Sequence, residues 1–237
     1  MNNPLITVIT VCFNAEKELE ATMLSVLNQS FESYEYLIID GGSKDHTVDI
    51  IKKYEDNPHV RWISEPDKGI YDAMNKGIRM AKGEWLNMMN AGDRFASNDV
   101  LEKVFANPIP EDKTFIYSDN FWDDGKGRLV RSNKDHRIMR LLHQCCIYKR
   151  ALHQGHGLYV VTPKIIVSDL LFFLTIPENE FYKTDTVISV NSKGGVSSGL
   201  WCQEGYLCAM VAFRKFTFSQ MILHYFSIRI KRFLHII

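Results

Sequence analysis

Apolar residues follow two alternating patterns along the first part of the chain. Short apolar runs recur, and the segments between them carry apolar residues three and four positions apart. A short apolar run is typical of a buried strand, and the longer spacing is typical of a helix with one buried face. The predicted strands are 5–11, 36–39, 60–63 and 85–89. This alternation predicts an α/β fold with a mostly parallel sheet flanked by helices.

Two helix signals stand out in this region. Apolar residues on one face predict a helix over 70–81, which Gly83 is expected to end. Asn14, directly after the first strand, is expected to cap the next helix.

Past Phe95 the pattern loosens. We expect a helix over 98–105, a strand over 114–118 and a hairpin turn over 123–127. No composition change marks a second folding unit. The chain is therefore expected to form one α/β domain over 1–205, divided near residue 95, with a helical extension over 206–237.

Composition narrows the class of protein. With 28 Lys and Arg against 28 Asp and Glu, the formal net charge is +0, so charge gives no reason to expect nucleic acid as a partner. The 5 cysteines are odd in number and form no CxxC pattern, which favours reduced thiols in a cytoplasmic protein. The N-terminus lacks a basic region, so no signal peptide is expected.

The C-terminal extension is basic and aromatic. No acid follows Glu204, and the longest uncharged stretch, 216–228, is shorter than the roughly 20 residues that span a bilayer. Residues 213–237 fit a helix lying on an anionic membrane, which would make the protein peripheral at the inner face of the cell membrane. A helix packed on the domain explains the same residues.

Acids follow three of the predicted strands. Asp40, Asp67 and Asp93 come after strands whose carboxyl ends share one sheet edge, where open α/β sheets bind ligands. Asp93 suits Mg²⁺ or Mn²⁺ holding a phosphorylated substrate. Asp40 can accept an N–H from a nucleobase. Each acid can also simply stabilise its turn.

Phosphate-binding glycine loops are absent from the sequence. There is no G-x-x-x-x-G-K-[ST], and residues 12–16 after the first strand do not form G-x-G-x-x-G. A phosphate would therefore be neutralised by a metal or by side chains.

Three ordered motifs, at 7–14, 39–47 and 64–77, resemble the family 2 glycosyltransferases with the GT-A fold. The resemblance implies an inverting, hexosyltransferase-type enzyme that uses a nucleotide sugar. It also implies that residues 1–95 bind the donor and residues 96–205 face the acceptor. It further implies that Asp93 is a metal ligand. The residues that it implies bind the nucleotide sugar are Thr10, Asn14, Asp40, Asp67, Asp72 and Asn90. Asn90 and Gly92 stand where the family usually has acids, so the metal motif of this chain has fewer carboxylates.

The catalytic base is expected in the second half of the chain. Asp169 lies in an apolar run and matches the position of the family's catalytic aspartate, although it can also cap a helix. His143 and Asp119 are weaker candidates for the acceptor side, each with a structural alternative. A loop over 194–198 can cover the site or be an ordinary surface loop.

The expected reaction is sugar transfer from a nucleotide sugar, with a UDP-sugar as the expected donor. The acceptor is expected to be a saccharide or a lipid-linked molecule in surface polysaccharide biosynthesis. A catalytically inactive nucleotide-sugar-binding module is the main alternative, because the metal motif is thin. A sugar nucleotidyltransferase is a weaker one, since residues 12–16 form no basic glycine loop.

Overall fold

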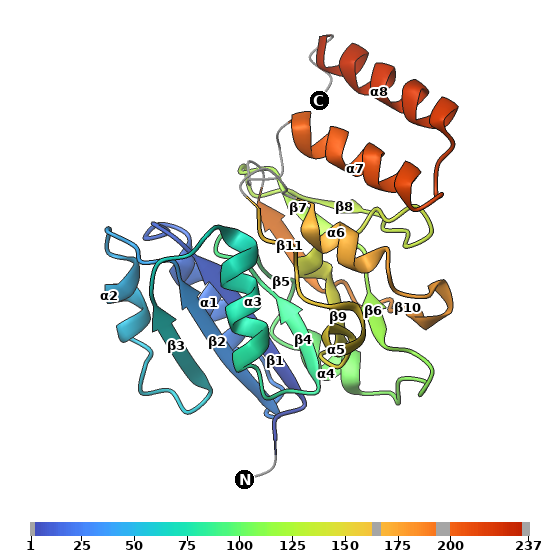
Figure 1. Ribbon diagram of the computed structural model, residues 1–237. Coiled ribbons are helices and arrows are strands. Elements are labelled where there is room, and N and C mark those ends of the chain that lie inside the picture. Colours follow the sequence, from blue (N-terminus) through green and yellow to red (C-terminus); the bar gives the residue numbers. More distant parts are fainter. Residues whose placement is uncertain (1–2, 163–166, 193–199, 234–237) are drawn as a thin grey trace.

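A seven-stranded sheet forms the centre of the molecule (Figure 1). The structure is a computed structural model that describes residues 3–162, 167–192 and 200–233. The strand order is β10-β6-β9-β4-β1-β2-β3, and only β9 runs antiparallel to its neighbours. The strands are β1 (Ile6–Cys12), β2 (Tyr34–Asp40), β3 (Val60–Ser64), β4 (Trp85–Met88), β6 (Phe115–Tyr117), β9 (Cys146–Lys149) and β10 (Phe181–Lys183). The expected mostly parallel α/β sheet is confirmed.

Helices cover both faces of this sheet. In β1, Ile9 and Val11 pack into the core shared with α3 (Ile70–Met80), α5 (Leu152–His156) and α6 (Ser168–Phe173). Ile6 and Val8 face the opposite core, built with α1 (Leu19–Leu27), α2 (Thr47–Lys52) and α4 (Val100–Phe105). Because both faces are buried, β1 and β2 need unbroken apolar runs rather than alternation with polar residues.

A second sheet of four strands has the order β5-β11-β7-β8. Its strands are β5 (Arg94–Phe95), β7 (Asn120–Asp123), β8 (Leu129–Ser132) and β11 (Ser189–Ser192). The expected turn over 123–127 joins β7 and β8, which pair antiparallel. Because β11 pairs with β5, residues 189–192 lie beside the segment that follows β4. Two 3-10 turns, η1 (His143–Cys145) and η2 (Glu178–Glu180), complete the middle of the chain.

Two local expectations were wrong. Asn14 does not cap α1, which begins at Leu19; its backbone has φ 49° in a turn. The helix expected over 70–81 is present as α3, but it ends at Met80 with its C-cap at Ala81, so Gly83 is not the residue that ends it. A Cβ on Gly83 would lie 2.4 Å from the backbone nitrogen of Thr7, so Gly83 is needed where the chain passes close to β1.

Helices α7 (Leu200–Ala212) and α8 (Phe218–Phe233) lie side by side at one end of the molecule, at the top of Figure 1. The boundary expected between residues 205 and 206 falls inside α7, because Gly205 does not interrupt the helix. A Cβ on Gly205 would lie 3.3 Å from Val167, so α7 packs closely there. None of the helices in the described ranges is long and apolar enough to cross a bilayer.

Candidate active site at the carboxyl edge of the sheet

The carboxyl ends of β1, β2, β4, β6 and β10 lie at one edge of the sheet, because these strands are mutually parallel or related through β9. Asp40 ends β2, Asp93 follows β4, and Asp119 follows β6. The topology therefore brings Asp40 and Asp93, two of the strand-end acids named from the sequence, to the same edge as Asp119.

Asp40 is fully buried and organises the turn after β2. One carboxylate oxygen, Oδ2, accepts hydrogen bonds from the backbone N–H groups of Gly42 (3.1 Å) and Ser43 (3.0 Å) and from the hydroxyl of Ser64 (2.6 Å). The other, Oδ1, accepts from the Ser43 hydroxyl and from the Cys12 thiol at 3.8 Å. The turn-stabilising alternative for Asp40 is therefore realised in the structure.

Asp67 lies against this turn. A Cβ on Gly41 would come within 2.8 Å of Asp67 Oδ2 and 3.3 Å of the ring of Phe13, so the glycine leaves room for both side chains. Lys76 pairs with Asp67 at 2.6 Å. Burial raises the pKa of Asp67 even though this ammonium opposes the shift. Phe13 is 62% exposed beside it, and offers a flat surface at the mouth of the turn.

Asn14 ties the loops after β1 and β2 together. Its N–H donates to the hydroxyl of Ser43 at 2.7 Å, and its Oδ1 accepts from the backbone N–H of Lys44 at 2.8 Å. The side chain stays exposed to solvent. Asn14 thus belongs to the same edge as Asp40, with a role in shaping the loops.

The side chains of Thr10 and Asp72 both make hydrogen bonds to the backbone. Thr10 is fully buried; its hydroxyl donates to the carbonyl of Met89 at 2.7 Å and lies 2.8 Å from the hydroxyl of Tyr36. Asp72 accepts the backbone N–H of Lys68 at 3.0 Å and so stabilises the first turn of α3. The structure does not bring the side chain of Thr10 to the exposed edge.

Asp93 is held by partners from two distant segments. Its Oδ2 accepts from Gln144 Nε2 (2.6 Å), and its Oδ1 accepts from Asn191 Nδ2 and from the N–H of Ser192, each at 3.1 Å. Burial raises the pKa of Asp93 despite these hydrogen bonds. Since a carboxylate offers about four acceptor positions, these three bonds leave room for about one further ligand.

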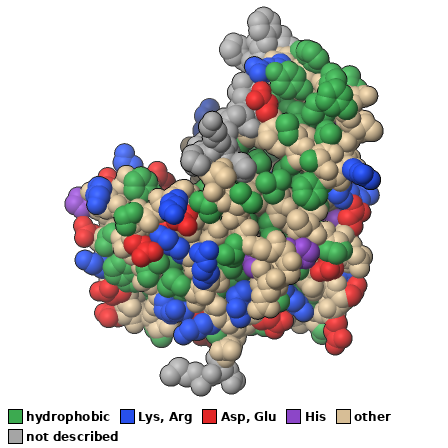
Figure 2. All heavy atoms as spheres, viewed as in Figure 1, with side chains coloured by type: hydrophobic (Ala, Val, Ile, Leu, Met, Phe, Trp, Pro, Cys, Tyr) green, Lys and Arg blue, Asp and Glu red, His purple; other side chains and the backbone are tan. Residues whose placement is uncertain are grey.

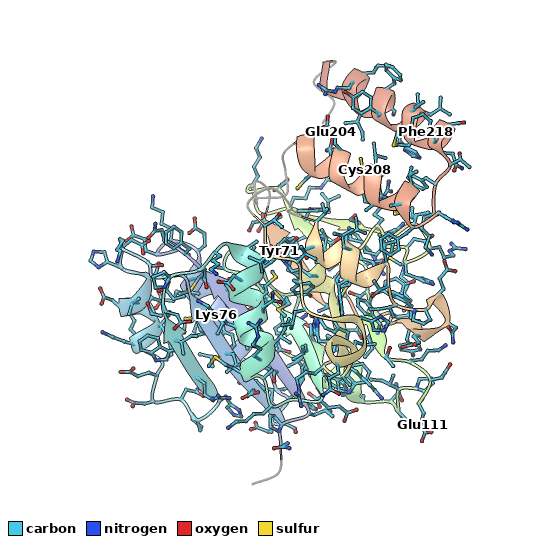
Figure 3. All side chains as sticks on the ribbon, viewed as in Figure 1. Tyr71, Lys76, Glu111, Glu204, Cys208 and Phe218 are labelled. Atoms are coloured by element: carbon cyan, nitrogen blue, oxygen red, sulfur yellow. The ribbon has the colours of Figure 1, made fainter. Side chains whose placement is uncertain are left out.

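Asp169 forms the centre of a second cluster, at the junction of α3, α6 and η1. Its Oδ1 accepts a hydrogen bond from the hydroxyl of Tyr71 at 2.8 Å. Tyr71 lies on the side of α3 that faces α6 (Figure 3). Its Oδ2 lies 2.9 Å from Nδ1 of His143. Asp169 lies within the first turn of α6, after the capping position at Val167, so the helix-cap alternative is not what the structure adopts.

His143 connects this cluster to the turn that carries Asp93. Its Nε2 lies 2.8 Å from Nδ2 of Asn90, and the N–H of Asp93 donates to the carbonyl of Asn90 at 3.0 Å. Both contacts are satisfied by a neutral imidazole that donates from Nδ1 to Asp169 and accepts at Nε2. The arrangement therefore joins Asn90, His143 and Asp169, three residues that the sequence analysis named separately.

The carboxyl group of Asp169 is 19% exposed and is held ionised. Burial alone would raise its pKa, but the hydrogen bonds from His143 and from the Tyr71 hydroxyl outweigh burial and lower it. An ionised carboxylate in a fixed orientation can accept a proton from a hydroxyl group that approaches it.

Asp119 lies apart from this cluster and is saturated by cations. Its Oδ1 is 2.7 Å from Lys183 Nζ and accepts the backbone N–H of Lys134 at 2.9 Å, while Oδ2 pairs with Arg131 at 2.9 Å. These interactions lower the pKa of Asp119 even though burial opposes them. Asp119 therefore anchors neighbouring basic residues.

A divalent cation was expected at Asp93. The described residues contain no group of three or more His, Cys, Asp or Glu side chains that could hold a metal ion. The buried Oδ1 of Asn90, however, has no hydrogen-bond partner. Asn90 and Asp93 would thus offer two hard oxygen ligands, and a metal bound there would take its remaining ligands from a diphosphate and water.

Sequence reasoning overlooked three of these residues as site components. Asn191 and Ser192 carry no motif and reach Asp93 only because β11 pairs beside β5. Tyr71 lies within the motif at 64–77, and its place on the buried face of α3 was the available signal. The expected loop at 194–198 lies outside the described residues.

Solved structures share this fold. S. aureus TarS 1-349 in complex with UDP-GlcNAc has a TM-score of 0.72 and 19% sequence identity, covering 88% of this chain and 65% of that chain. The mannosyltransferase PcManGT from Pyrobaculum calidifontis in complex with GDP-Man and Mn²⁺ has a TM-score of 0.62 at 18% identity. The matched region covers 97% of this chain and 65% of the mannosyltransferase. The fold is therefore that of the GT-A glycosyltransferases.

Sequence comparison defines the family. Residues 7–159 match the description Glycosyl transferase family 2. A PGL/p-HBAD biosynthesis glycosyltransferase of Mycobacterium bovis is 30% identical over 217 residues, covering 86% of this chain and 83% of the relative. An uncharacterized glycosyltransferase of Haemophilus influenzae is 38% identical over 105 residues, 44% of this chain and 42% of the relative. The chain belongs to glycosyl transferase family 2, and it is a glycosyltransferase enzyme.

Proposed function

We propose that this enzyme transfers a sugar from a UDP-sugar to a hydroxyl group of an acceptor. The transfer inverts the configuration at the anomeric carbon. The observation that carries the proposal is the orientation of Asp169. Tyr71 and His143 hold its two oxygens at 2.8 and 2.9 Å, and Asn90 links His143 to the turn of Asp93. This arrangement puts a fixed, ionised carboxylate next to the turn where the donor diphosphate is expected.

The donor side of the proposal rests on the turn after β2. Gly41, with Phe13 and Asp67 packed against it, offers a narrow, partly aromatic surface for a nucleobase. An N–H contact from the base to Asp40 requires one of the present hydrogen bonds from Gly42, Ser43 or Ser64 to open. The proposed UDP donor is supported by the UDP-GlcNAc bound in TarS.

In the proposed reaction the acceptor hydroxyl gives its proton to Asp169 as its oxygen attacks the anomeric carbon. The bond from that carbon to the diphosphate breaks, and the nucleoside diphosphate leaves. Tyr71 and His143 keep the carboxylate ionised and oriented until the proton arrives. Asn90 and Asp93 would hold Mg²⁺ or Mn²⁺, which when bound supplies positive charge opposite the leaving diphosphate.

A catalytically inactive donor-binding protein is the second candidate. It is favoured by one observation: Asp93, the proposed metal ligand, already accepts hydrogen bonds from Gln144, Asn191 and Ser192. Incubating the chain with a panel of UDP- and GDP-sugars and candidate acceptors, with and without Mn²⁺, separates the two. Product formation or donor hydrolysis supports the enzyme, whereas donor binding without any turnover supports the inactive protein.

The acceptor is proposed to be a saccharide or lipid-linked molecule met at the cytoplasmic face of a membrane, as in surface polysaccharide assembly. Helix α8 supports this proposal. Its side chains Phe218, Leu223 and Phe226 are 65%, 71% and 58% exposed, and Ile222 and Ile230 extend the same stripe. Figure 2 shows hydrophobic side chains gathered over this end of the molecule. The sequence of α8 also includes the basic residue Arg229. Such a face suits peripheral contact with an anionic membrane.

A further inference from the structure

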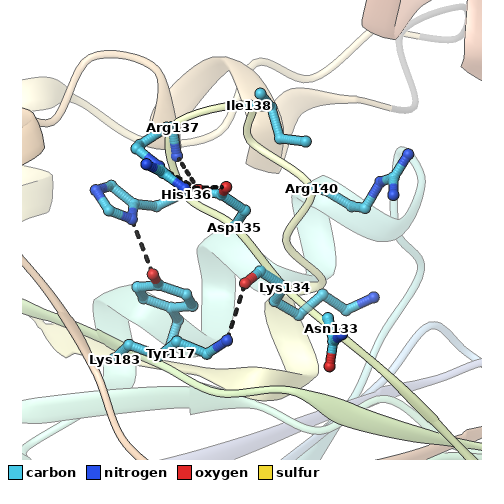
Figure 4. A pocket seen from close by; sticks show the side chains of 9 residues that line it. All are labelled: Tyr117, Asn133, Lys134, Asp135, His136, Arg137, Ile138, Arg140 and Lys183. Carbon is cyan, nitrogen blue, oxygen red and sulfur yellow. Dashed lines mark hydrogen bonds and ion pairs between the residues drawn. The ribbon is translucent and has the colours of Figure 1, made fainter.

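A cationic cavity lies beside the site described above. Its volume is about 560 Å³, within the range of small-molecule binding sites. The lining carries four cations, Lys134, Arg137, Arg140 and Lys183, with His136 and a single acid, Asp135 (Figure 4). The excess of positive charge makes an anion the natural occupant.

Two of these cations are already neutralised. Arg137 binds Asp135 with both ends of its guanidinium, Nε to Oδ1 at 3.0 Å and Nη2 to Oδ2 at 2.8 Å. Lys183 Nζ lies 2.7 Å from a carboxylate oxygen of Asp119. No ion pair joins Lys134 or Arg140 to an acid within the described ranges. Lys134 and Arg140 are therefore the two lining cations whose charge is not paired with an acid among the described residues.

Lys134 is unusual because it is only 6% exposed. Its ammonium donates to the hydroxyl of Ser132 at 3.2 Å and lies 5.9 Å from the ring centroid of Trp122. Burial lowers the pKa of Lys134, and the charge of Arg140 adds to this shift. Buried lysines are rare unless they are paired. Arg140 is close enough to repel Lys134, so an anion bound to both would relieve this repulsion.

The cavity lies on the side of the sheet away from the proposed nucleotide site. Tyr117 and Lys183 end β6 and β10, which run parallel to β4 at the same carboxyl edge. The strand order puts them beyond β9, opposite to β2 and β3. From Arg140 the chain continues directly into η1, where His143 contacts Asp169. A ligand in the cavity would thus sit on the acceptor side.

We propose that this cavity binds a phosphate or diphosphate group carried by the acceptor, with Lys134 and Arg140 as its principal ligands. The inference deepens the proposed function and rests on it, since it assigns the chemistry of the acceptor. An arginine fork and an ammonium together match the several oxygens of a phosphate. The remaining volume leaves room for the group attached to it.

Calorimetric titration of the full chain with inorganic pyrophosphate, in EDTA to exclude metal-dependent binding at the donor site, tests the proposal. We expect Arg140→Gln and Lys134→Met to weaken binding by at least about tenfold each. Arg79→Gln, an exposed arginine on α3, is the matched control and should bind like the wild type. Arg140 is exposed, so Arg140→Gln keeps the test decisive even if the buried Lys134→Met variant fails to fold.

Three results would overturn the anion site: no pyrophosphate binding, equal affinity in Arg140→Gln, or displacement of pyrophosphate by UDP with Mn²⁺. Competition with geranyl diphosphate and with glucose 1-phosphate identifies the source of the phosphate. Stronger competition by the first supports a lipid-linked acceptor, and equal competition supports a phosphorylated saccharide. If neither competes, the acceptor assignment is wrong.

Donor binding is measured on the same variants, so the two proposals fail separately. UDP binding with Mn²⁺ is expected to be the same in Arg140→Gln and in the wild type. If the wild type binds no nucleotide or nucleotide sugar, the proposed function fails and the acceptor assignment falls with it. If donor binding is intact but pyrophosphate binds Arg140→Gln as tightly as the wild type, only the acceptor assignment fails.

Discussion

Nδ1 of His143 lies 2.9 Å from Oδ2 of Asp169. The histidine comes from the 3-10 turn before β9 and the aspartate from the first turn of α6, so only the tertiary fold brings them together. With Tyr71 on the other carboxylate oxygen, the pair fixes both the charge and the orientation of the proposed base.

Asp169→Asn should abolish most of the sugar transfer. The amide has nearly the same shape but cannot accept the proton, so we expect kcat to fall by about 10²–10⁴-fold. Donor affinity, measured by titration with a UDP-sugar and Mn²⁺, should stay within about twofold of the wild type because the change removes general-base chemistry rather than donor contacts. Full activity in Asp169→Asn would show that another group is the base.

Tyr71→Phe should separate positioning from chemistry. The lost hydroxyl is one of the groups that lower the pKa of Asp169, so the acid limb of the kcat/KM profile should move to higher pH. We expect a fall in kcat of roughly tenfold, corresponding to the loss of one hydrogen bond to a charged group. A fall in kcat with an unchanged pH profile would indicate a purely structural role for Tyr71.

Asp93→Asn should weaken the metal-dependent step. The change removes the negative charge proposed to hold Mg²⁺ or Mn²⁺, so UDP affinity in the presence of Mn²⁺ should fall by about tenfold or more. It also puts an amide N–H group opposite the donor groups of Gln144 or Asn191, which should cost about 1–3 kcal/mol of stability.

Calorimetry with and without Mn²⁺, and urea unfolding, measure the two effects separately. Asp49→Asn, at an exposed position on α2, is the matched control. Unchanged Mn²⁺ dependence in Asp93→Asn would remove Asp93 from the metal site.

His153 should make the fold sensitive to mild acid. Its ring is 8% exposed, stacks on Phe172 with centroids 4.2 Å apart and lies 2.9 Å from the carbonyl of Gly157. Burial lowers its pKa from 6.5 to about 4. Between these values the unfolded chain binds a proton that the folded chain does not. Stability is therefore full above about pH 6.5 and falls by up to about 3 kcal/mol as the pH approaches 4.

Urea unfolding at pH 7.5 and pH 4.5 measures this loss. His153→Phe keeps a ring against Phe172 but cannot be protonated, so its stability should change less between the two pH values than that of the wild type. Equal pH dependence in both proteins would assign the acid sensitivity to other groups.

Helix α8 should govern contact with anionic membranes. Leu223→Glu and Phe226→Glu add a negative charge to its exposed apolar stripe and should greatly reduce co-sedimentation with phosphatidylglycerol vesicles. Ser227→Glu adds the same charge at the margin of the stripe and is the matched control. Retained binding in Phe226→Glu would show that the apolar stripe of α8 is not the membrane contact.

The sequence alone determined the parts of the fold that depend on local patterns. Apolar runs and helical spacing identified β1 to β4 and α3, because burial on both faces of the sheet imposes those patterns directly. The turn residues at 123–127 identified the hairpin of β7 and β8. The motifs at 7–14, 39–47 and 64–77 indicated the family, and the strand ends indicated which edge carries Asp40 and Asp93.

Only the tertiary structure decided what these side chains touch. Asp93 receives Asn191 from 98 positions away, through strand pairing that no local pattern encodes. The carboxylate of Asp40 is fully buried and accepts hydrogen bonds from the N–H groups of its own turn, which replace the water it would otherwise bind. The cationic cavity depends on Lys183 and Arg140 meeting at one sheet edge. Local spacing fixes periodicity and burial, whereas contacts between distant segments are set by how strands pair and helices pack.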